Sequence, residues 1–179
     1  MLTIVIPGRE MYDDANGEFV YTKEVTLQLE HSLVSLSKWE AKWNKPFLSS
    51  ANKTDEEILD YIRCMTVTQN VNKNIYYRLS KENIQRINEY INLPMTATTF
   101  SDKGGPRNKE VVTAEIIYYW MISLNVPMEC QKWHLNRLLT LIKVCSIKNQ
   151  PPRKMSRKEI LSQNRALNAS RKKALGTRG

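Results

Sequence analysis

The sequence predicts an α+β fold that is predominantly helical: a small N-terminal β-sheet, about five helices after it, and a basic C-terminal helix. Three observations predict this fold. Apolar and polar residues alternate near the N-terminus, which is the period of a half-buried strand. After residue 31 the apolar residues recur at spacings of three and four, as in amphipathic helices. Residues 151–179 contain nine basic residues and one acidic residue, so they carry +8 of the chain's net charge of +9.

This charge distribution divides the 179 residues into a nearly neutral domain, residues 1–150, and a basic extension, residues 151–179. About 150 residues can bury enough surface to form an independent core. No apolar run approaches the roughly 20 residues of a membrane-spanning helix, and the N-terminus lacks the pattern of a signal peptide. The three cysteines have no C-x-x-C spacing, so we expect reduced thiols. We therefore expect a cytoplasmic protein with no membrane partner.

The N-terminal sheet is predicted from three short segments. Residues 2–6 are an apolar run that ends at a Pro-Gly pair, and residues 19–22 form a second candidate strand. Residues 25–30 give the clearest signal, because valine and two leucines face one side while threonine, glutamine and glutamate face the other. Residues 13–17 predict a polar turn between strands. That turn explains the adjacent aspartates better than a pair of catalytic carboxylates does.

The helices are predicted from capping residues and apolar stripes. Ser32 and Ser80 are positioned to cap helices, and a glutamate three residues after Thr54 and after Ser156 completes a capping box. Residues 94–108 contain two prolines and two glycines and predict an exposed loop. We expect the two helices that follow this loop to form the central core hairpin. The predicted helical ranges are 33–43, 74–79, 81–91, 112–124, 128–147 and 157–173, and a further helix follows Thr54 with apolar residues at 58, 59, 62 and 65.

Catalytic motifs are missing from the sequence. It has no G-x-S-x-G, no H-E-x-x-H and no dinucleotide fingerprint, and the glycine-rich residues 103–107 do not form a P-loop pattern. Cys130 and His134 would share one face of the predicted helix 128–147, as a metal site or a Cys–His dyad requires. Two ligands do not make a zinc site, and the other histidine, His31, is about a hundred residues away. We expect a packed cysteine, no metal, no cofactor, no catalytic residue and no enzymatic activity.

The four tryptophans are the candidate partner-binding residues of the domain, because all of them fall on apolar helical stripes. Packing in the core is the default interpretation of such stripes. The alternative is an exposed aromatic groove that receives a partner helix, since aromatic residues often anchor interfaces. These residues are Trp39, Trp43, Trp120 and Trp133.

The basic extension has three interpretations: a solvated tail, a segment that docks on an acidic protein, or a segment that contacts nucleic acid. Phosphate contacts would be electrostatic and strongly dependent on salt. The extension has no aromatic residue, so base stacking is not expected to contribute. The candidate contact residues are Arg153, Lys154, Arg157, Lys158, Arg165, Arg171, Lys172, Lys173 and Arg178.

Four segments carry a resemblance to a known family. They are LEHSLVSLSKWE at residues 29–40, QKWHLNRLLTL at residues 131–141, NRALN at residues 164–168 and LGTRG at residues 175–179. Together they resemble a family of small tailed-bacteriophage proteins that are encoded in the tail-gene region and are often labelled tail assembly chaperones. The resemblance extends over nearly the whole chain.

This resemblance implies a non-enzymatic helper of virion morphogenesis in the cytoplasm of the infected bacterial host. Tail assembly chaperones coat the long tape-measure protein, help to recruit tail-tube subunits and usually leave before the tail matures. The family pattern supplies no catalytic residue. In this hypothesis the tryptophan helices offer apolar surface to client helices, and the basic extension steers acidic clients. The alternatives are a structural virion component, in the tail, baseplate or connector, and a nucleic-acid-binding accessory protein; self-association is left open.

Overall fold

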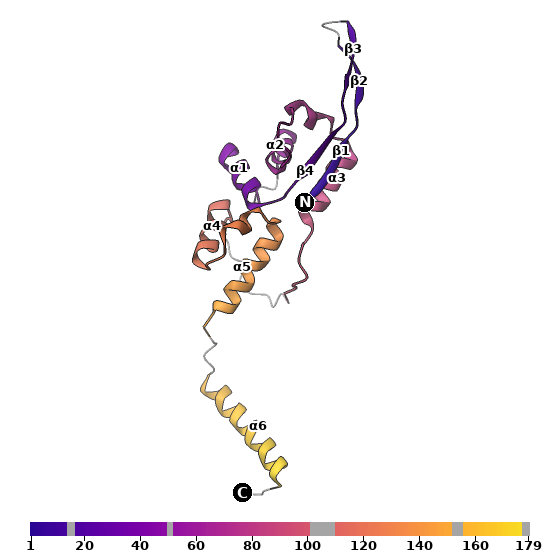
Figure 1. Cartoon of the computed structure of the whole chain (residues 1–179). Helices are drawn as coiled ribbons and strands as arrows, with labels where there is room; N and C mark the ends of the chain where they lie inside the picture. The colour runs from indigo at the N-terminus through magenta and orange to yellow at the C-terminus, as the bar shows by residue number, and fades with distance from the viewer. Residues whose placement is uncertain (14–16, 50–51, 101–109, 152–155, 177–179) are drawn as a thin grey trace. The chain divides into compact units, whose positions relative to one another are not determined.

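The computed structural model describes residues 1–13, 17–49, 52–100, 110–151 and 156–176. It contains two compact units, Met1–Lys148 and Asn149–Gly179. We call the first unit the body. The predicted fold class is confirmed: a small antiparallel β part comes first, helices follow, and a separate helix lies near the C-terminus (Figure 1).

The β part consists of two consecutive strand pairs. Its strands are β1 (Leu2–Ile6), β2 (Arg9–Asp13), β3 (Glu18–Thr22) and β4 (Val25–Leu29). β1 pairs with β4 and β2 pairs with β3, both antiparallel. The register continues without a slip across the break between the two pairs, because Ile6 faces Val25 and Arg9 faces Thr22. The break requires Gly8, where an added Cβ would lie 2.6 Å from the Thr22 carbonyl oxygen.

The body contains five α-helices and two 3₁₀ helices among its described residues. The predicted caps are confirmed: the side chains of Ser32, Thr54 and Ser80 each accept a hydrogen bond from a backbone N–H in the first turn of the following helix. The elements are α1 (Leu33–Trp43), α2 (Asp55–Met65), η1 (Lys73–Arg78), α3 (Lys81–Asn92), α4 (Ala114–Ser123), η2 (Met128–Lys132) and α5 (Leu135–Asn149).

Two apolar cores meet at α1. The first core holds the inner faces of β1 and β4 together with side chains of α2, η1 and α3. The second core holds side chains of α4, η2 and α5. Trp39 of α1 packs in the first core, while Leu33 and Leu36 of the same helix pack in the second. Helix α1 therefore joins the two halves of the body.

The structure corrects the predicted helix 128–147. Residues 128–132 form η2, a 3₁₀ helix, and α5 begins only at Leu135. The break arises because the chain pairs with the start of α1 at this point: Ser32 and His134 form an antiparallel bridge, and the Leu135 N–H donates to the His31 carbonyl over 2.7 Å. Cys130 and His134 therefore do not share a helical face.

Smaller corrections concern the turn, the loop and η1. Strand β2 was not expected, and Asp13 belongs to it rather than to the turn, whose residues 14–16 lie outside the described residues. Residues 94–100 form the irregular segment predicted, and residues 101–109 lie outside the described residues. The helix predicted at 74–79 is the 3₁₀ helix η1.

Two expectations from the composition concern reduced thiols and the lack of a membrane-spanning helix. Cys64, Cys130 and Cys145 are free thiols. Across the described ranges, every helix is too short or too polar to span a lipid bilayer.

Candidate functional site

Helix α6 (Arg157–Leu175) is capped at both ends by the residues that flank it. The Ser156 N–H donates to Glu159 Oε2 over 2.8 Å, and the Glu159 N–H donates to Ser156 Oγ over 3.2 Å, which is the predicted capping box. At the other end Gly176 adopts the left-handed conformation, with φ 62° and ψ 20°, and its N–H bonds to the Lys172 carbonyl. These caps define a helix of 19 residues in the C-terminal unit.

No residue of α6 is buried. Its large apolar side chains are uncovered: Ile160 is 44% exposed, Leu161 51%, Leu167 46% and Leu175 74%. They belong to two adjacent seams in which residues alternate at spacings of three and four, as on the contact face of a coiled coil. The first seam is Arg157, Ile160, Asn164, Leu167, Arg171 and Ala174, and the second is Lys158, Leu161, Arg165, Asn168, Lys172 and Leu175.

Basic side chains lie beside the apolar ones in both seams. Helix α6 holds six basic residues and one acidic residue, Glu159, which gives the helix a net charge of +5. A shallow depression on its surface is lined by Leu161 and Ser162 together with Arg157, Lys158 and Arg165. Six of the nine predicted contact residues of the extension thus lie on α6, and Arg153, Lys154 and Arg178 lie outside the described residues.

The two tryptophans of α1 are packed against α2. Trp39 has no exposed surface, and its indole N–H donates to the Glu57 carbonyl over 2.8 Å. Trp43 is half-buried, and its indole N–H donates to Asp60 Oδ2 over 2.9 Å. This corrects the expectation that Trp39 offers apolar surface to a client. Replacing Trp39 by alanine would leave a cavity in the core and lower the stability of the fold by about 3–5 kcal/mol. Such a variant would therefore not test binding.

The other two tryptophans lie in the second half of the body. Trp120 is half-buried at the edge of the second core. Trp133 is 36% exposed, and the Arg137 guanidinium lies 4.2 Å from its ring centroid. Trp39 and Trp43 pack against the first core, and Trp120 packs against the second. The four tryptophans therefore do not form a single aromatic groove.

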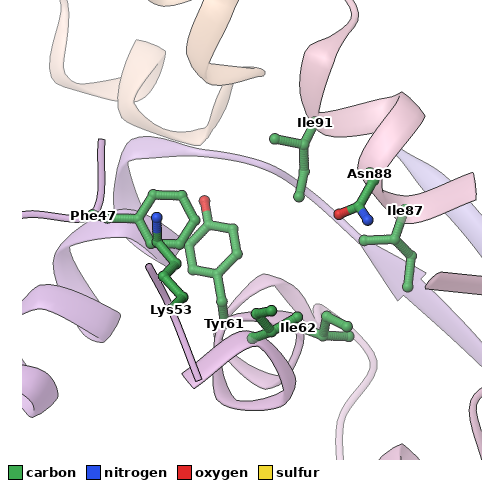
Figure 2. A pocket seen from close by; sticks show the side chains of 8 residues that line it. Phe47, Lys53, Tyr61, Ile62, Ile87, Asn88 and Ile91 are labelled. Atoms are coloured by element: carbon green, nitrogen blue, oxygen red, sulfur yellow. The ribbon is translucent and has the colours of Figure 1, made fainter. Parts of the chain in front are cut away.

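A pocket of about 300 Å³ opens between α2 and α3. Figure 2 shows its two sides: Phe47, Lys53, Tyr61 and Ile62 on one, and Ile87, Asn88 and Ile91 of α3 on the other. Ile58 of α2 completes the lining. The walls are mostly apolar, with one charged side chain.

Two histidines meet where the two cores join. The rings of His31 and His134 are edge to face, with centroids 5.1 Å apart, and only 2% and 5% of the two residues is exposed. Tyr61 Oη lies 2.6 Å from His31 Nδ1, and His134 Nε2 donates to the Tyr90 carbonyl over 3.0 Å. The Tyr90 hydroxyl in turn donates to Glu30 Oε1 over 2.7 Å. These contacts tie β4, α2, α3 and the start of α5 together.

Burial keeps both histidines neutral. Loss of hydration, with a smaller contribution from the neighbouring His134, lowers the pKa of His31 from 6.5 to about 4. Burial also lowers the pKa of His134, against the opposing effects of its bond to the Tyr90 carbonyl and of the Glu30 charge. Because Nε2 of His134 carries the donated proton, its Nδ1 is an acceptor, and it has no hydrogen-bond partner in the described structure. A charged His134 would bury an unpaired N–H.

The described residues contain no group of three or more His, Cys, Asp or Glu side chains that could hold a metal ion. Burial raises the pKa of the Cys64 and Cys130 thiols, which makes them poor nucleophiles. Among known proteins, no family model, no curated protein and no solved structure matches the chain.

Sequence reasoning found α6 but missed the pocket and the histidine pair. The capping box and charge of residues 151–179 are local signals, so they could be read directly. The pocket is lined by residues from α2, α3 and the chain on either side of residue 50. His31 and His134 are brought together only by the pairing of the chain before α1 with the chain before α5. Neither arrangement has a periodic signature in the sequence.

Proposed function

We propose that this protein is a non-enzymatic tail assembly chaperone of a bacteriophage, which binds acidic helical segments of the tape-measure protein, the tail-tube protein or both during virion morphogenesis. One observation carries the proposal: α6 is a capped helix on which four large apolar side chains and six basic side chains are exposed together. The resemblance of the sequence to a phage tail-region family supplies the identity of the clients.

The two seams of α6 explain the kind of client. An apolar side chain on a seam needs an apolar neighbour on the partner helix, and a basic side chain next to it favours a carboxylate. Because each seam holds both kinds, the complementary surface is an amphipathic helix whose apolar stripe is flanked by aspartate or glutamate. Such a helix would bury the exposed apolar side chains of α6 and place carboxylates beside its basic side chains.

The test is calorimetric binding of the full chain to purified segments of the tape-measure and tail-tube proteins encoded beside it. Replacing Ile160 and Leu167 by serine should weaken binding about tenfold or more, because burial of two large apolar side chains is lost. The matched control replaces Ala166 and Ala169, on the other side of α6, by serine. Equal binding by the two variants would contradict the proposal. The protein is also expected to be absent from purified particles, since a chaperone leaves before maturation.

A second candidate, nucleic-acid binding, rests on the same six basic residues of α6. Helix α6 has no aromatic side chain, so contacts to phosphates would have to supply the affinity. That mode predicts retention on DNA or RNA that falls by orders of magnitude between about 50 and 200 mM salt. Retention that is absent at the lower salt concentration would remove this candidate.

A further inference from the structure

The pocket between α2 and α3 has a size and a lining that distinguish it from a packing defect. Its volume of about 300 Å³ is at the lower end of the range for ligand sites. Four of the eight lining residues are isoleucines, two from each helix, and Figure 2 labels Ile62, Ile87 and Ile91. A pocket of this size accommodates a large apolar side chain.

The aromatic wall of the pocket is held in place from behind. Phe47 stacks on Tyr61, with ring centroids 3.8 Å apart, and its backbone N–H donates to Glu40 Oε1 over 2.7 Å. The edge of Trp39 packs against Phe47 at 5.0 Å, and the Tyr61 hydroxyl is fixed by His31 at 2.6 Å. A wall anchored at each ring is formed before any ligand arrives, so little ordering cost accompanies binding.

Besides the Tyr61 hydroxyl, which bonds to His31, the polar groups of the pocket are a lysine and an amide. Lys53 Nζ lies 4.3 Å from the centroid of the Phe47 ring, over apolar surface, and Asn88 reaches the pocket from α3. Burial lowers the pKa of Lys53, while the nearby Glu57 raises it. The Glu57 carboxylate is itself bonded to Lys45 at 2.5 Å and to the Thr54 N–H at 2.9 Å. The lining residues therefore carry one positive charge and no negative one.

We propose that this pocket receives a large apolar side chain of the client protein, with the client's adjacent carboxylate placed against Lys53 and Asn88. This inference rests on the proposed function, and it names a second contact for the same acidic client. Charge complementarity selects this occupant. Helix α6, from the same or a second copy, is disfavoured in the pocket because its net charge of +5 places basic side chains beside each leucine.

The experiment uses the full chain with ¹³C-labelled isoleucine methyl groups and two small probes, N-acetyl-L-leucine and N-acetyl-L-leucinamide. These probes share the apolar side chain and differ in the carboxylate. N-acetyl-L-leucine should shift the methyl signals of Ile58, Ile62, Ile87 and Ile91 with a dissociation constant of about 1 mM, as expected for a small fragment. The amide should bind about tenfold more weakly. Unshifted signals, or equal binding of the two probes, would overturn the inference.

Two lysine variants make the test specific to the pocket. Lys53→Met keeps the length of the side chain, removes the charge and should make the two probes bind equally. The control Lys73→Met, at an exposed lysine of η1, should leave the tenfold preference unchanged. The dispersion of the isoleucine methyl spectrum shows whether each variant is folded. A preference that survives Lys53→Met would contradict the assignment of the carboxylate to this lysine.

The same variants separate this inference from the proposed function. If probes shift the pocket methyls but tape-measure and tail-tube segments do not bind the protein, the proposed client is wrong and the pocket site stands. If the segments bind through α6 but Lys53→Met does not weaken them and the probes leave the methyls unshifted, the pocket inference is wrong and the proposed function stands.

Discussion

Acidification should destabilise the body through His31. This residue is 2% exposed, its Nδ1 lies 2.6 Å from the Tyr61 hydroxyl, and its ring contacts that of His134. A proton on His31 would place a charge in the core beside a second histidine. The other charged groups at this junction are Glu30 and the N-terminal ammonium of Met1, which pair with each other at 3.0 Å.

The magnitude follows from the difference in proton affinity between the folded and unfolded chain. Burial lowers the pKa of His31 from 6.5 to about 4, so the unfolded chain binds a proton at a pH where the folded chain does not. Stability from this residue is therefore complete above about pH 6.5 and is lost as the pH falls toward 4. Linkage gives a loss of about 2 kcal/mol at pH 5 and about 3 kcal/mol at pH 4.

The measurement is urea unfolding at a series of pH values between 7.5 and 4, followed by tryptophan fluorescence. All four tryptophans lie in the body, so the signal reports the body without α6. His31→Gln keeps an acceptor for the Tyr61 hydroxyl and cannot be protonated in this range. Carboxylates titrate in both proteins, and the difference between the two free-energy curves isolates His31.

The wild-type curve should fall away from the His31→Gln curve below pH 6.5. His134 remains in the variant and its lowered pKa has the same sign, so both curves decline, but the wild-type curve declines more. Parallel curves from pH 7.5 to pH 4 would show that His31 is protonated equally in both states. That result would refute the argument that burial at this junction keeps His31 neutral.

Two further substitutions test the two units separately. Glu40→Gln should destabilise the body by about 2 kcal/mol, as measured by urea unfolding. The two carboxylate oxygens of Glu40 accept hydrogen bonds from the Phe47 and Ala114 N–H groups, both at 2.7 Å. The amide of glutamine has one oxygen and can replace only one of these acceptors. Ser156→Ala should destabilise the first turn of α6 by about 1 kcal/mol, which is measured as faster amide exchange there, and should leave the tryptophan unfolding curve of the body unchanged. Unchanged amide exchange in that turn would contradict the role of Ser156 as the cap of α6.

The local parts of the fold could be predicted from the sequence. The start of α1 after Ser32 and of α2 after Thr54 were predicted from single capping residues, because a cap and its amide are three residues apart. The alternation in β4 was equally readable, with Leu27 and Leu29 buried and Thr26 and Gln28 exposed. Signals of this kind need no knowledge of the tertiary structure.

The parts that failed depend on contacts distant in sequence. Residues 128–147 have the apolar spacing of one helix, yet pairing of His134 with Ser32 leaves η2, a break and α5. Strand β2 has few apolar residues, and it forms because the β1–β4 register continues into it. Glu40 caps α4 in place of Thr113, whose side chain makes no cap bond, and nothing in the local sequence indicates that.

The tryptophans show why a candidate site is harder to predict than a helix. An apolar stripe has the same spacing whether it faces a core or a partner, so Trp39 and Leu161 look alike in sequence. Only the structure separates them: Trp39 has no exposed surface, whereas Leu161 is 51% exposed on a helix with no buried residue. The candidate contact surface therefore moves from the tryptophans to α6.

The buried acidic residues of the body have hydrogen-bond and ion-pair partners within the body. Glu40, Glu57 and Asp60 are all buried, and each is bonded to a backbone N–H, a lysine or an indole within the body. Among the described residues, the salt bridges join groups of the body, and none involves a basic side chain of α6. The buried acids of the body are thus satisfied by groups of the body itself. Because these acids already have partners within the body, the proposed carboxylate partners of the basic side chains of α6 are expected on another protein.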